Sequence, residues 1–477
     1  MRYSPLAVDL YELTMLAGYL EQGMAERPAI FDLYFRTNPF AGGYAVFAGL
    51  EPALDALENL RFLPEEIAYL QELAIFPPGF CDFLASFRFR GKVMAPAEGT
   101  VVFANEPLLS VSGTLAEAQL VETLLLNIIN FQTLIATKAA RICSAAGDAE
   151  VIEFGLRRAQ GPNGGLSASR AACVGGAAAT SNVLAGMAFQ LPVRGTHAHS
   201  WVQSFPDELS AFQAYADCFP AGTVLLVDTY DTLGSGVPNA ITVARRLREK
   251  GYQLQGIRLD SGDLAYLSRR AREMLDEAGF PEVRILASNE IDEEVIASIV
   301  NEGGRVDIYG VGTKLATGAG AGGVALNGVY KLVAIDGQPK MKITSDTAKA
   351  TLPGSKRVRR VCNADGSFLQ DVVSLEGDEI GAGATVYDPT NPLRHTILPE
   401  GVHFKELRRT VMVDGRRTLP SEPLAAMAER CRRQLQLLPA GCQRFINPHR
   451  YKVSISSPLK ELRWTMIQAA ATRRSRI

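Results

Sequence analysis

Six clusters of polar and glycine residues, each at the end of a short apolar run, could carry chemistry in this 477-residue chain. They offer arginines, carboxylates, a histidine pair and a turn of glycines with a hydroxyl. Arginine binds phosphate or carboxylate through paired hydrogen bonds, and glycine-flanked N–H groups beside Ser or Thr hydroxyls cradle phosphate. Carboxylates can hold Mg²⁺ that a pyrophosphate also touches, so the mixture fits a phosphorylated sugar. The clusters are residues 155–158, 195–200, 228–231, 258–263, 288–290 and 310–313.

Single residues of these clusters also have simpler explanations. Arg157 and Arg158 could pair with an acid such as Glu153, which is the commoner fate of one arginine. Asp260 could cap a helix that begins at Gly262, and Asp228 could cap a turn. One of the two histidines, His197 or His199, could be structural. Separate explanations do not account for the full set at consecutive strand ends, so we interpret the clusters as one site.

The elements that must position this site alternate between strands and helices. The helical patterns lie at residues 239–250, 262–278 and 292–302, and the small-residue run 166–187 predicts a helix that packs closely on a sheet. This alternation predicts a parallel sheet, and the number of units favours a closed β/α barrel, in which all strand carboxyl ends open on one face. The predicted strands are residues 151–154, 191–194, 223–228, 255–260, 283–288 and 306–312.

The segments on either side of this α/β region have a different texture. Residues 9–23 predict a first helix with Asp9 as N-cap, Gly23 as stop and Tyr11 in the first turn. Short alternating strands follow before and after the α/β region, with a basic loop at 340–360. We expect four segments: 1–147, an N-terminal helix with a β-rich α+β domain; 148–325, the barrel; 326–400, a β-rich return onto the N-terminal domain; and 401–477, a basic C-terminal segment.

Bulk composition limits the classes of function. With 47% hydrophobic and 21% charged residues the chain is a soluble globular protein, and a net charge of −2 gives no reason to expect nucleic acid. No apolar run approaches membrane-spanning length, and Asp9 and Glu12 interrupt any secretory signal. The seven cysteines form no CxxC pair, which favours a reducing cytoplasm and buried, unreactive thiols.

Five motifs stand out in combination: DLYELTM at 9–15, EFGLRRAQG at 153–161, GTHAHS at 195–200, RLDSGDL at 258–264 and YGVGT at 309–313. Together they closely resemble the nicotinate phosphoribosyltransferase family. The resemblance runs over nearly the whole chain. It implies the irregular β/α barrel of the type II phosphoribosyltransferases, with a second, β-rich α+β domain built from the N- and C-terminal segments. It also implies a homodimer whose two active sites each borrow the neighbour's N-terminal helix.

The resemblance also assigns residues that bind the flat ring and its acid group. Tyr11, acting from the partner subunit, and Phe154 would sandwich the pyridine ring. Arg157 and Arg258 would contact the nicotinate carboxylate or substrate phosphates. Ser181 stands where the related nicotinamide enzyme has an aspartate that reads the carboxamide, and a serine would not repel a carboxylate.

The remaining assigned residues handle phosphate and phosphoryl groups. Asp231 and Asp260 would be catalytic, near the ribose and the Mg²⁺-bound pyrophosphate. His199 would be catalytic and modified, because it matches the histidine that this family phosphorylates with ATP. The other substrate-binding residues would be Ser200 and the 5′-phosphate cradle of Ser288, Gly312 and Thr313.

The implied activity joins nicotinate to phosphoribosyl pyrophosphate, giving nicotinate mononucleotide and pyrophosphate. ATP hydrolysis through a phosphohistidine would drive this ligase-type glycosyl transfer, with Mg²⁺ as cofactor, as the first step of NAD salvage from nicotinate. Two alternatives stay open: a nicotinamide phosphoribosyltransferase of the same fold, and a barrel that binds phosphorylated metabolites without turnover. Acidic and basic clusters at all six strand ends argue against the second alternative.

Overall fold

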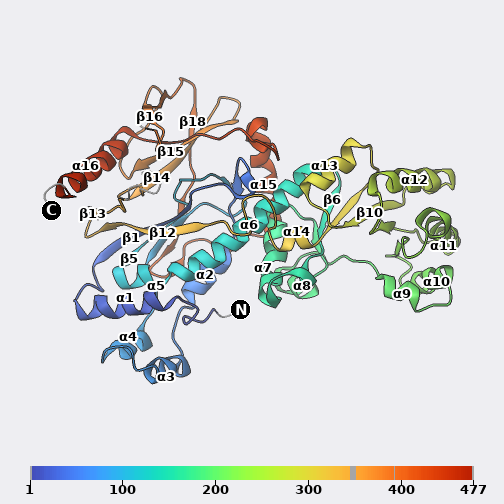
Figure 1. Cartoon of the computed structure of the whole chain (residues 1–477), viewed down its shortest axis with the longest axis horizontal. Helices are drawn as coiled ribbons and strands as arrows, with labels where there is room; N and C mark the ends of the chain where they lie inside the picture. Colours follow the sequence, from blue (N-terminus) through green and yellow to red (C-terminus); the bar gives the residue numbers. More distant parts are fainter. Residues whose placement is uncertain (1–2, 344–350, 392, 475–477) are drawn as a thin grey trace. The chain divides into compact units, whose positions relative to one another are not determined.

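The computed structural model of the chain describes residues 3–343, 351–391 and 393–474 and divides into two compact units (Figure 1). Unit 1 comprises Met1–Leu134 and Ala325–Ile477, and unit 2 comprises Ile135–Val324. Helix α6 (Glu122–Ala146) begins in unit 1 and ends in unit 2. The mixed α/β class is confirmed, whereas the boundaries of the four expected segments stay predictions. Part of the expected basic loop, residues 344–350, lies outside the described residues, and its last residues form the start of a strand, β14.

Unit 1 contains two large sheets and a short two-stranded one. In the first, three strands from the N-terminal part of the chain lie together in the middle, and strands from the C-terminal part flank them, because β12 pairs with β1 and β19 with β3. Its order is β13 (Gln338–Pro339), β12 (Gly328–Ile335), β1 (Pro28–Phe35), β5 (Leu109–Thr114), β3 (Lys92–Ala95), β19 (Arg409–Val413) and β20 (Arg416–Arg417). The second has the order β17 (His395–Ile397), β16 (Thr385–Tyr387), β21 (Val453–Ile455), β15 (Phe368–Leu375), β14 (Lys356–Cys362) and β18 (His403–Glu406). The short sheet pairs β2 (Ala45–Val46) with β4 (Val101–Val102).

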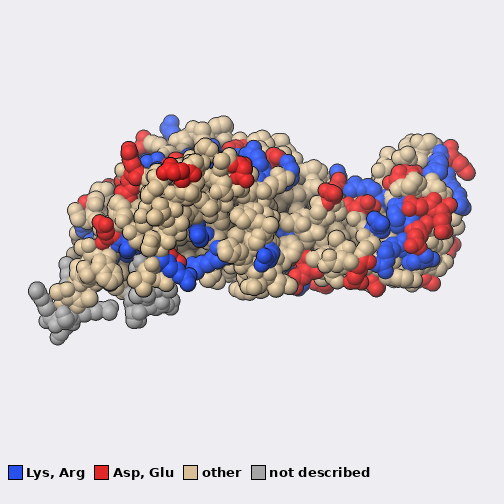
Figure 2. Space-filling view, turned by 90° about the horizontal axis from the view of Figure 1, so that it is seen from above, with Lys and Arg blue, Asp and Glu red and all other residues tan. Residues whose placement is uncertain are grey.

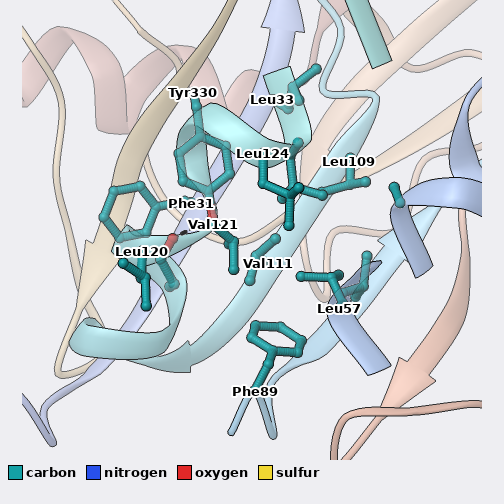
Figure 3. Close-up of a cluster of buried hydrophobic side chains, with 14 of the residues drawn as sticks. Phe31, Leu33, Leu57, Phe89, Leu109, Val111, Leu120, Val121, Leu124 and Tyr330 are labelled. Atoms are coloured by element: carbon teal, nitrogen blue, oxygen red, sulfur yellow. Dashed lines mark hydrogen bonds between the residues drawn. The ribbon is translucent and has the colours of Figure 1, made fainter. Parts of the chain in front are cut away.

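The main hydrophobic core of unit 1 is formed between the first sheet and its helices (Figure 3). Along β1 the side chains of Phe31, Leu33 and Phe35 are buried on one face, as the two-residue period of a strand requires. The ring of Phe31 stacks on Tyr330 of β12 at 5.0 Å, and the Tyr330 hydroxyl donates to Ala118 O at 2.7 Å. This contact fastens the helix carrying Ala118 to strands from both chain ends. The helices of unit 1 are α1 (Leu10–Glu21), α2 (Leu50–Glu58), α3 (Pro64–Glu72), α4 (Phe80–Ser86), α5 (Leu115–Leu120), α15 (Leu424–Leu437) and α16 (Ser457–Arg474).

Unit 2 contains the predicted parallel sheet, but it is not a closed one. An isolated bridge between Thr180 and Val193 extends one end of the sheet, and β8 forms the other end. The predicted strand at 191–194 is therefore wrong, since only Val193 pairs. Among the described residues no main-chain pairing closes the sheet, so the expected barrel is not confirmed. The order is β7 (Ala179–Thr180), β6 (Glu150–Glu153), β11 (Ile308–Val311), β10 (Arg284–Asn289), β9 (Gly256–Leu259) and β8 (Val224–Leu226).

The helices of unit 2 confirm three of the predicted patterns and correct one. The small-residue run 166–187 is not a single helix, because α7 ends at Val174 and β7 and α8 follow. Gly176 fits the break, because its φ of 111° lies in the left-handed region that favours glycine. Gly175 before it must also be a glycine, since a Cβ there would lie 2.2 Å from Ala136 O of α6. The helices are α7 (Gly161–Val174), α8 (Val183–Phe189), α9 (His199–Gln203), α10 (Glu208–Cys218), α11 (Val237–Glu249), α12 (Leu264–Glu277), α13 (Glu293–Asn301) and α14 (Thr313–Ala316).

Charged side chains of both signs are mixed over one end of the molecule, and most of the cysteine thiols are shielded from solvent. Over the end that carries α10 to α12, Lys and Arg are interspersed with Asp and Glu (Figure 2), as in the pairs of Asp217 with Arg246 and Lys250. None of the seven cysteines, all of which the structure describes, is in a disulfide; four are buried, and Cys218 is the exposed one. Burial raises the pKa of Cys143 and of Cys173 to about 12. Within residues 3–343, 351–391 and 393–474, no helix has the length and apolar character that crossing a bilayer requires.

Candidate active site

A hydrogen-bond cluster around Arg258 lies at the carboxyl ends of β9 and β10. Arg258 donates from Nε to Ser288 Oγ at 2.7 Å, from Nη2 to Asp260 Oδ1 at 2.8 Å and from Nη1 to Thr196 Oγ1 at 3.0 Å. Ser288 in turn donates to Asp260 Oδ1 at 2.5 Å. Because Arg258 pairs with Leu286 in the parallel register, Ser288 comes two residues later, on the same face of the sheet. The guanidinium is thereby fixed in one orientation.

Asp260 is held ionised by this cluster. Burial alone raises its pKa, but the charge of Arg258 and the hydrogen bonds from Ser288 and Arg258 outweigh burial, so the pKa lies below its ordinary value. Its second oxygen, Oδ2, lies 3.6 Å from His199 Nε2, which is beyond hydrogen-bond distance. The sequence-based explanation of Asp260 as a helix cap is wrong, because Asp263 occupies that position and accepts from Tyr266 N–H at 2.9 Å.

His199 faces the same cluster from the start of α9. Its Nδ1 lies 3.1 Å from Thr229 Oγ1, in the segment that follows β8. The side chain is 39% exposed, so a substrate can reach the imidazole. The next residue, Ser200, is exposed as well. A nucleophilic nitrogen is therefore held beside a carboxylate and an arginine, while one face stays open.

Asp228 connects two strand ends and keeps one carboxylate oxygen without a hydrogen-bond partner among the described residues. Its Oδ2 accepts from Asp260 N–H at 2.9 Å and from the Ser261 hydroxyl at 2.6 Å. The alternative explanation, that Asp228 only caps a turn, does not describe these contacts, because they reach the segment that follows the neighbouring strand, β9. Its Oδ1 is buried and has no hydrogen-bond partner among the described residues. Buried carboxylate oxygens are normally satisfied, so this one is a candidate ligand atom.

Phe154 follows β6 and presents its ring beside this cluster. The guanidinium carbon of Arg258 lies 5.7 Å from the ring centroid, within the range of a cation–π contact. A Cβ on Gly310 would lie 2.6 Å from the ring, so the ring packs directly on the backbone of β11. Gly310 therefore sets how close the aromatic face can come to the sheet.

Glu153 is buried among donors that are not arginines. Its carboxylate accepts from the hydroxyls of Ser169 at 2.8 Å and Thr180 at 2.7 Å, and from Gly155 N–H. The explanation that Arg157 or Arg158 pairs with Glu153 is therefore wrong. Both arginines are exposed and form no ion pair with any residue that the structure describes. Their charges are available to a ligand.

The other predicted residues lie outside the hydrogen-bond cluster around Arg258. Asp231 is exposed and accepts from Gly234 N–H at 2.9 Å, capping a short π-helix (Thr232–Gly236). Thr313, which follows Gly312 at the start of α14, donates to Glu290 Oε1 at 3.2 Å. Ser181 follows β7, and its N–H donates to Glu153 O at 2.9 Å.

Tyr11 belongs to unit 1 rather than unit 2. It lies on α1, and its side chain is 45% exposed. Burial of the hydroxyl, together with the negative charges of Glu122, Glu12 and Asp9, raises its pKa to about 12. The hydroxyl therefore stays protonated, and the ring presents a neutral aromatic surface.

Sequence reasoning missed two hydroxyl residues that orient the site. Thr196 accepts from Arg258 and Thr229 contacts His199. Both stand inside the polar clusters at 195–200 and 228–231. A hydroxyl next to a candidate histidine or acid at a strand end was the available signal.

The residues present fit Mg²⁺ carried by a substrate rather than a closed metal site. In the part of the chain that the structure describes, no three His, Cys, Asp or Glu side chains form a group that could hold a metal. Mg²⁺ commonly binds through one or two carboxylates together with substrate phosphates. Asp228 Oδ1 and Asp260 Oδ2 are the carboxylate oxygens that could bind Mg²⁺ in this way.

A parallel sheet with arginine, acidic, histidine and hydroxyl groups at its carboxyl edge defines an α/β enzyme for phosphorylated small molecules. Three family models match the chain: the nicotinate phosphoribosyltransferase N-terminal domain at residues 6–130, the nicotinate phosphoribosyltransferase family at 149–370 and its C-terminal domain at 355–463. The chain belongs to the nicotinate phosphoribosyltransferase family.

Individual relatives agree with this membership. Nicotinate phosphoribosyltransferase of Bacillus subtilis is 43% identical over 461 residues, covering 94% of this chain and 92% of the relative. The crystal structure of human nicotinic acid phosphoribosyltransferase matches with a TM-score of 0.84 and 34% identity, covering 96% of this chain and 99% of that one. A nicotinate-nucleotide pyrophosphorylase from Pyrococcus furiosus, with a TM-score of 0.71 and 22% identity, shares the fold. The predicted family and its enzymatic activity in NAD biosynthesis are confirmed.

Proposed function

We propose that this chain forms nicotinate mononucleotide and pyrophosphate from nicotinate and phosphoribosyl pyrophosphate, and that ATP hydrolysis through a phosphohistidine at His199 drives the reaction. One observation carries the proposal. His199 lies 3.1 Å from Thr229 and 3.6 Å from Asp260, and Asp260 is bound to Arg258. A phosphorylatable nitrogen thus shares its surroundings with groups that bind anions and cations. ATP chemistry and transfer chemistry would act on one set of charges.

Substrate binding follows from the groups left open. The ring of Phe154 stacks on one face of the pyridine, and Arg157, exposed and unpaired within the described residues, binds the nicotinate carboxylate. Arg258 is held by three acceptors and contributes its fixed charge to the phosphates. The remaining proposed contacts to the ribose and its 5′-phosphate come from Ser200, Ser288, Gly312 and Thr313.

The transfer step needs positioning more than acid or base catalysis. The bond between ribose C1′ and pyrophosphate breaks, and the pyridine nitrogen forms the new bond to C1′. Mg²⁺ held by Asp260, with Asp231 or the Oδ1 atom of Asp228 that lacks a hydrogen-bond partner among the described residues, would neutralise the charge of the departing pyrophosphate. The fixed Arg258–Asp260 pair contributes a preorganised field at the reacting carbon.

The phosphoryl step uses the imidazole nitrogen that faces Asp260. Thr229 holds Nδ1, so Nε2 is the nitrogen open to the γ-phosphoryl group of ATP. ADP leaves, and water later releases phosphate from the histidine. The free energy of this hydrolysis displaces the transfer equilibrium toward nicotinate mononucleotide.

The finer features of the fold and assembly belong to the same proposal. The sheet of unit 2 is the irregular β/α barrel of the type II phosphoribosyltransferases, and the protein is a cytoplasmic homodimer in which Tyr11 reaches the partner's active site. Exposed apolar side chains support association with a second copy. They are Leu10, Tyr11 and Met15 on α1, and Val183, Leu184 and Met187 on α8.

The test compares pyrophosphate release with nicotinate and with nicotinamide, in the presence and absence of ATP. We expect release with nicotinate, little with nicotinamide, and stimulation by ATP. Preference for nicotinamide would assign the related activity. No release from either substrate would support the non-catalytic alternative.

The variant His199→Ala tests the coupling. We expect it to lose ATP hydrolysis, ATP stimulation and acid-labile ³²P transfer from γ-labelled ATP, while slow ATP-independent transfer remains. His403→Ala, at an exposed histidine of unit 1, is the matched control and should behave as wild type. Full ATP coupling in His199→Ala would refute the phosphohistidine.

A further inference from the structure

The two ends of the unit 2 sheet are joined by a side chain instead of a strand pair. One end is the bridge at Val193, and the other is β8, whose Val227 N–H points to β9 and donates to Arg258 O. Successive N–H groups of a strand point to opposite edges, so Leu226 N–H faces the free edge of β8. His197 Nε2 lies 3.2 Å from this N–H and accepts its hydrogen bond.

The geometry defines the protonation state of His197. Because Nε2 accepts, the proton of the neutral ring is on Nδ1, which lies 3.3 Å from Ala198 O and donates to it. The ring is 7% exposed and packs against Tyr215 at 4.8 Å and Phe212 at 6.1 Å, both on α10. A protonated ring would lose the acceptor and leave Leu226 N–H without a partner.

His197 is the central of three contacts that hold one short segment. Thr196 contacts Arg258 of β9, His197 contacts Leu226 of β8, and His199 contacts Thr229 after β8. The contact of His197 is the buried one, and it lies two residues from the imidazole proposed to react. A shift of residues 195–199 away from β8 would change the distance from His199 to Asp260.

We propose that His197 is a positioning residue, whose neutral imidazole fastens residues 195–199 to the free edge of β8 and so places His199 against Thr229 and Asp260. The effect on His199 chemistry rests on the proposed function. The hydrogen bond from Leu226 N–H to His197 Nε2, called the seam below, does not. Neither His197 nor Leu226 needs to touch substrate.

The seam should respond to pH through His197. Burial, the largest effect, lowers the pKa of His197. The bond to Ala198 O opposes burial as the next largest effect, and the charges of Arg258 and His199 lower the pKa further. Tyr215, the titratable group facing the ring from α10, has a raised pKa and stays neutral. The unfolded chain therefore binds the proton first, and folding stability falls as pH drops below about 6.5.

The experiment compares His197→Leu with His197→Gln, because the Gln amide oxygen can take the place of Nε2 as acceptor and Leu cannot. Hydrogen exchange by mass spectrometry follows the peptide containing Leu226, and acid-labile ³²P labelling follows His199. In His197→Leu we expect faster exchange at Leu226, labelling of His199 reduced on the order of tenfold, a lower ATP-coupled kcat and an unchanged KM for nicotinate. His197→Gln should restore most of the protection from exchange at Leu226, most of the labelling of His199 and most of the ATP-coupled kcat. His403→Leu, an exposed control, should match wild type.

Three outcomes would overturn the proposal: unchanged exchange at Leu226 in His197→Leu, altered exchange with normal labelling of His199, or a folded His197→Gln as defective as His197→Leu. If the Leu variant does not fold, the decision passes to His197→Gln, in which the extra loss of stability below about pH 6.5 should disappear. If wild type is not labelled by ATP, the proposed function fails, while the exchange result still decides whether the seam exists.

Discussion

At the scale of single residues, the site depends on backbone positions that carry no side chain. Gly310 lets the ring of Phe154 lie on β11, and the ring in turn approaches Arg258. No polar chemistry is lost if Gly310 changes. Only the height of the aromatic surface above the sheet changes.

Gly310→Ala should therefore impair nicotinate binding without unfolding the protein. The new Cβ would meet the Phe154 ring at 2.6 Å, and a ring at the end of a side chain can move aside. We expect the KM for nicotinate to rise roughly fivefold, since loss of a stacked arrangement costs about 1 kcal/mol. Gly222→Ala, where a Cβ would meet nothing within 4 Å, is the control. A wild-type KM in Gly310→Ala would show that the ring does not bind the substrate.

The sequence indicated which residues lie at the site better than it indicated which hydrogen bonds those residues form. Arg258, Asp260, Ser288 and His199 stand in strand-end clusters, and the parallel sheet brings them together because all its strands end at one edge. Which acceptor each donor chooses is a matter of distances of a few tenths of an ångström. For that reason, the pairing of Glu153 with hydroxyls instead of arginines could not be predicted.

At the scale of elements, α6 and α13 are joined by a buried ion cluster in unit 2. Glu293 at the start of α13 accepts from Arg141 at 2.8 Å and lies 2.5 Å from Lys138, both on α6. The three side chains are at most 3% exposed. One carboxylate therefore contacts two buried cations, and its removal takes from both the negative charge of Glu293.

Glu293→Ala should lower the free energy of unfolding by about 3–5 kcal/mol, the usual cost of leaving a buried charge without its partner. Urea denaturation monitored by circular dichroism would measure the change. Glu294→Ala, at the exposed neighbour on the same helix, should stay within about 0.5 kcal/mol of wild type. Equal stabilities of the two variants would mean that the cluster does not hold the helices together.

The elements show where local pattern is and is not informative. Amphipathic helices such as α12 and apolar strands such as β10 were predicted with bounds close to those observed, because burial of one face imposes a period. β7 has two residues within a run of Ala and Gly, which gives no period at all. The helix expected there was wrong for that reason. The strand expected at 191–194 was wrong because only Val193 pairs, and His197, four residues later, makes the connection to β8.

At the scale of the whole molecule, the proposed sharing of active sites between subunits can be tested by mixing two inactive variants. Tyr11→Ala disables the part supplied by the partner, and Asp260→Ala disables the part supplied by the subunit itself. In mixed dimers one of the two sites has both residues intact. We expect co-expression or subunit exchange to restore roughly a quarter of the wild-type activity.

The control mixes Asp260→Ala with Arg258→Ala. Both residues lie in unit 2 and are hydrogen-bonded to each other, so every site in a mixed dimer keeps one defect. No activity should return. Recovery in this control, or none in the first mixture, would contradict sites shared through Tyr11.

One exposed cysteine, Cys218, gives the molecule a site at which a probe can be attached. Cys143 and Cys173 stay protonated near neutral pH, whereas Cys218 is exposed at the end of α10, three residues after the tyrosine that packs on His197. A fluorophore attached there through a maleimide would lie on α10, the helix whose Tyr215 packs on His197 in the segment that carries His199. Turnover could then be followed optically in the natural sequence, with no engineered cysteine.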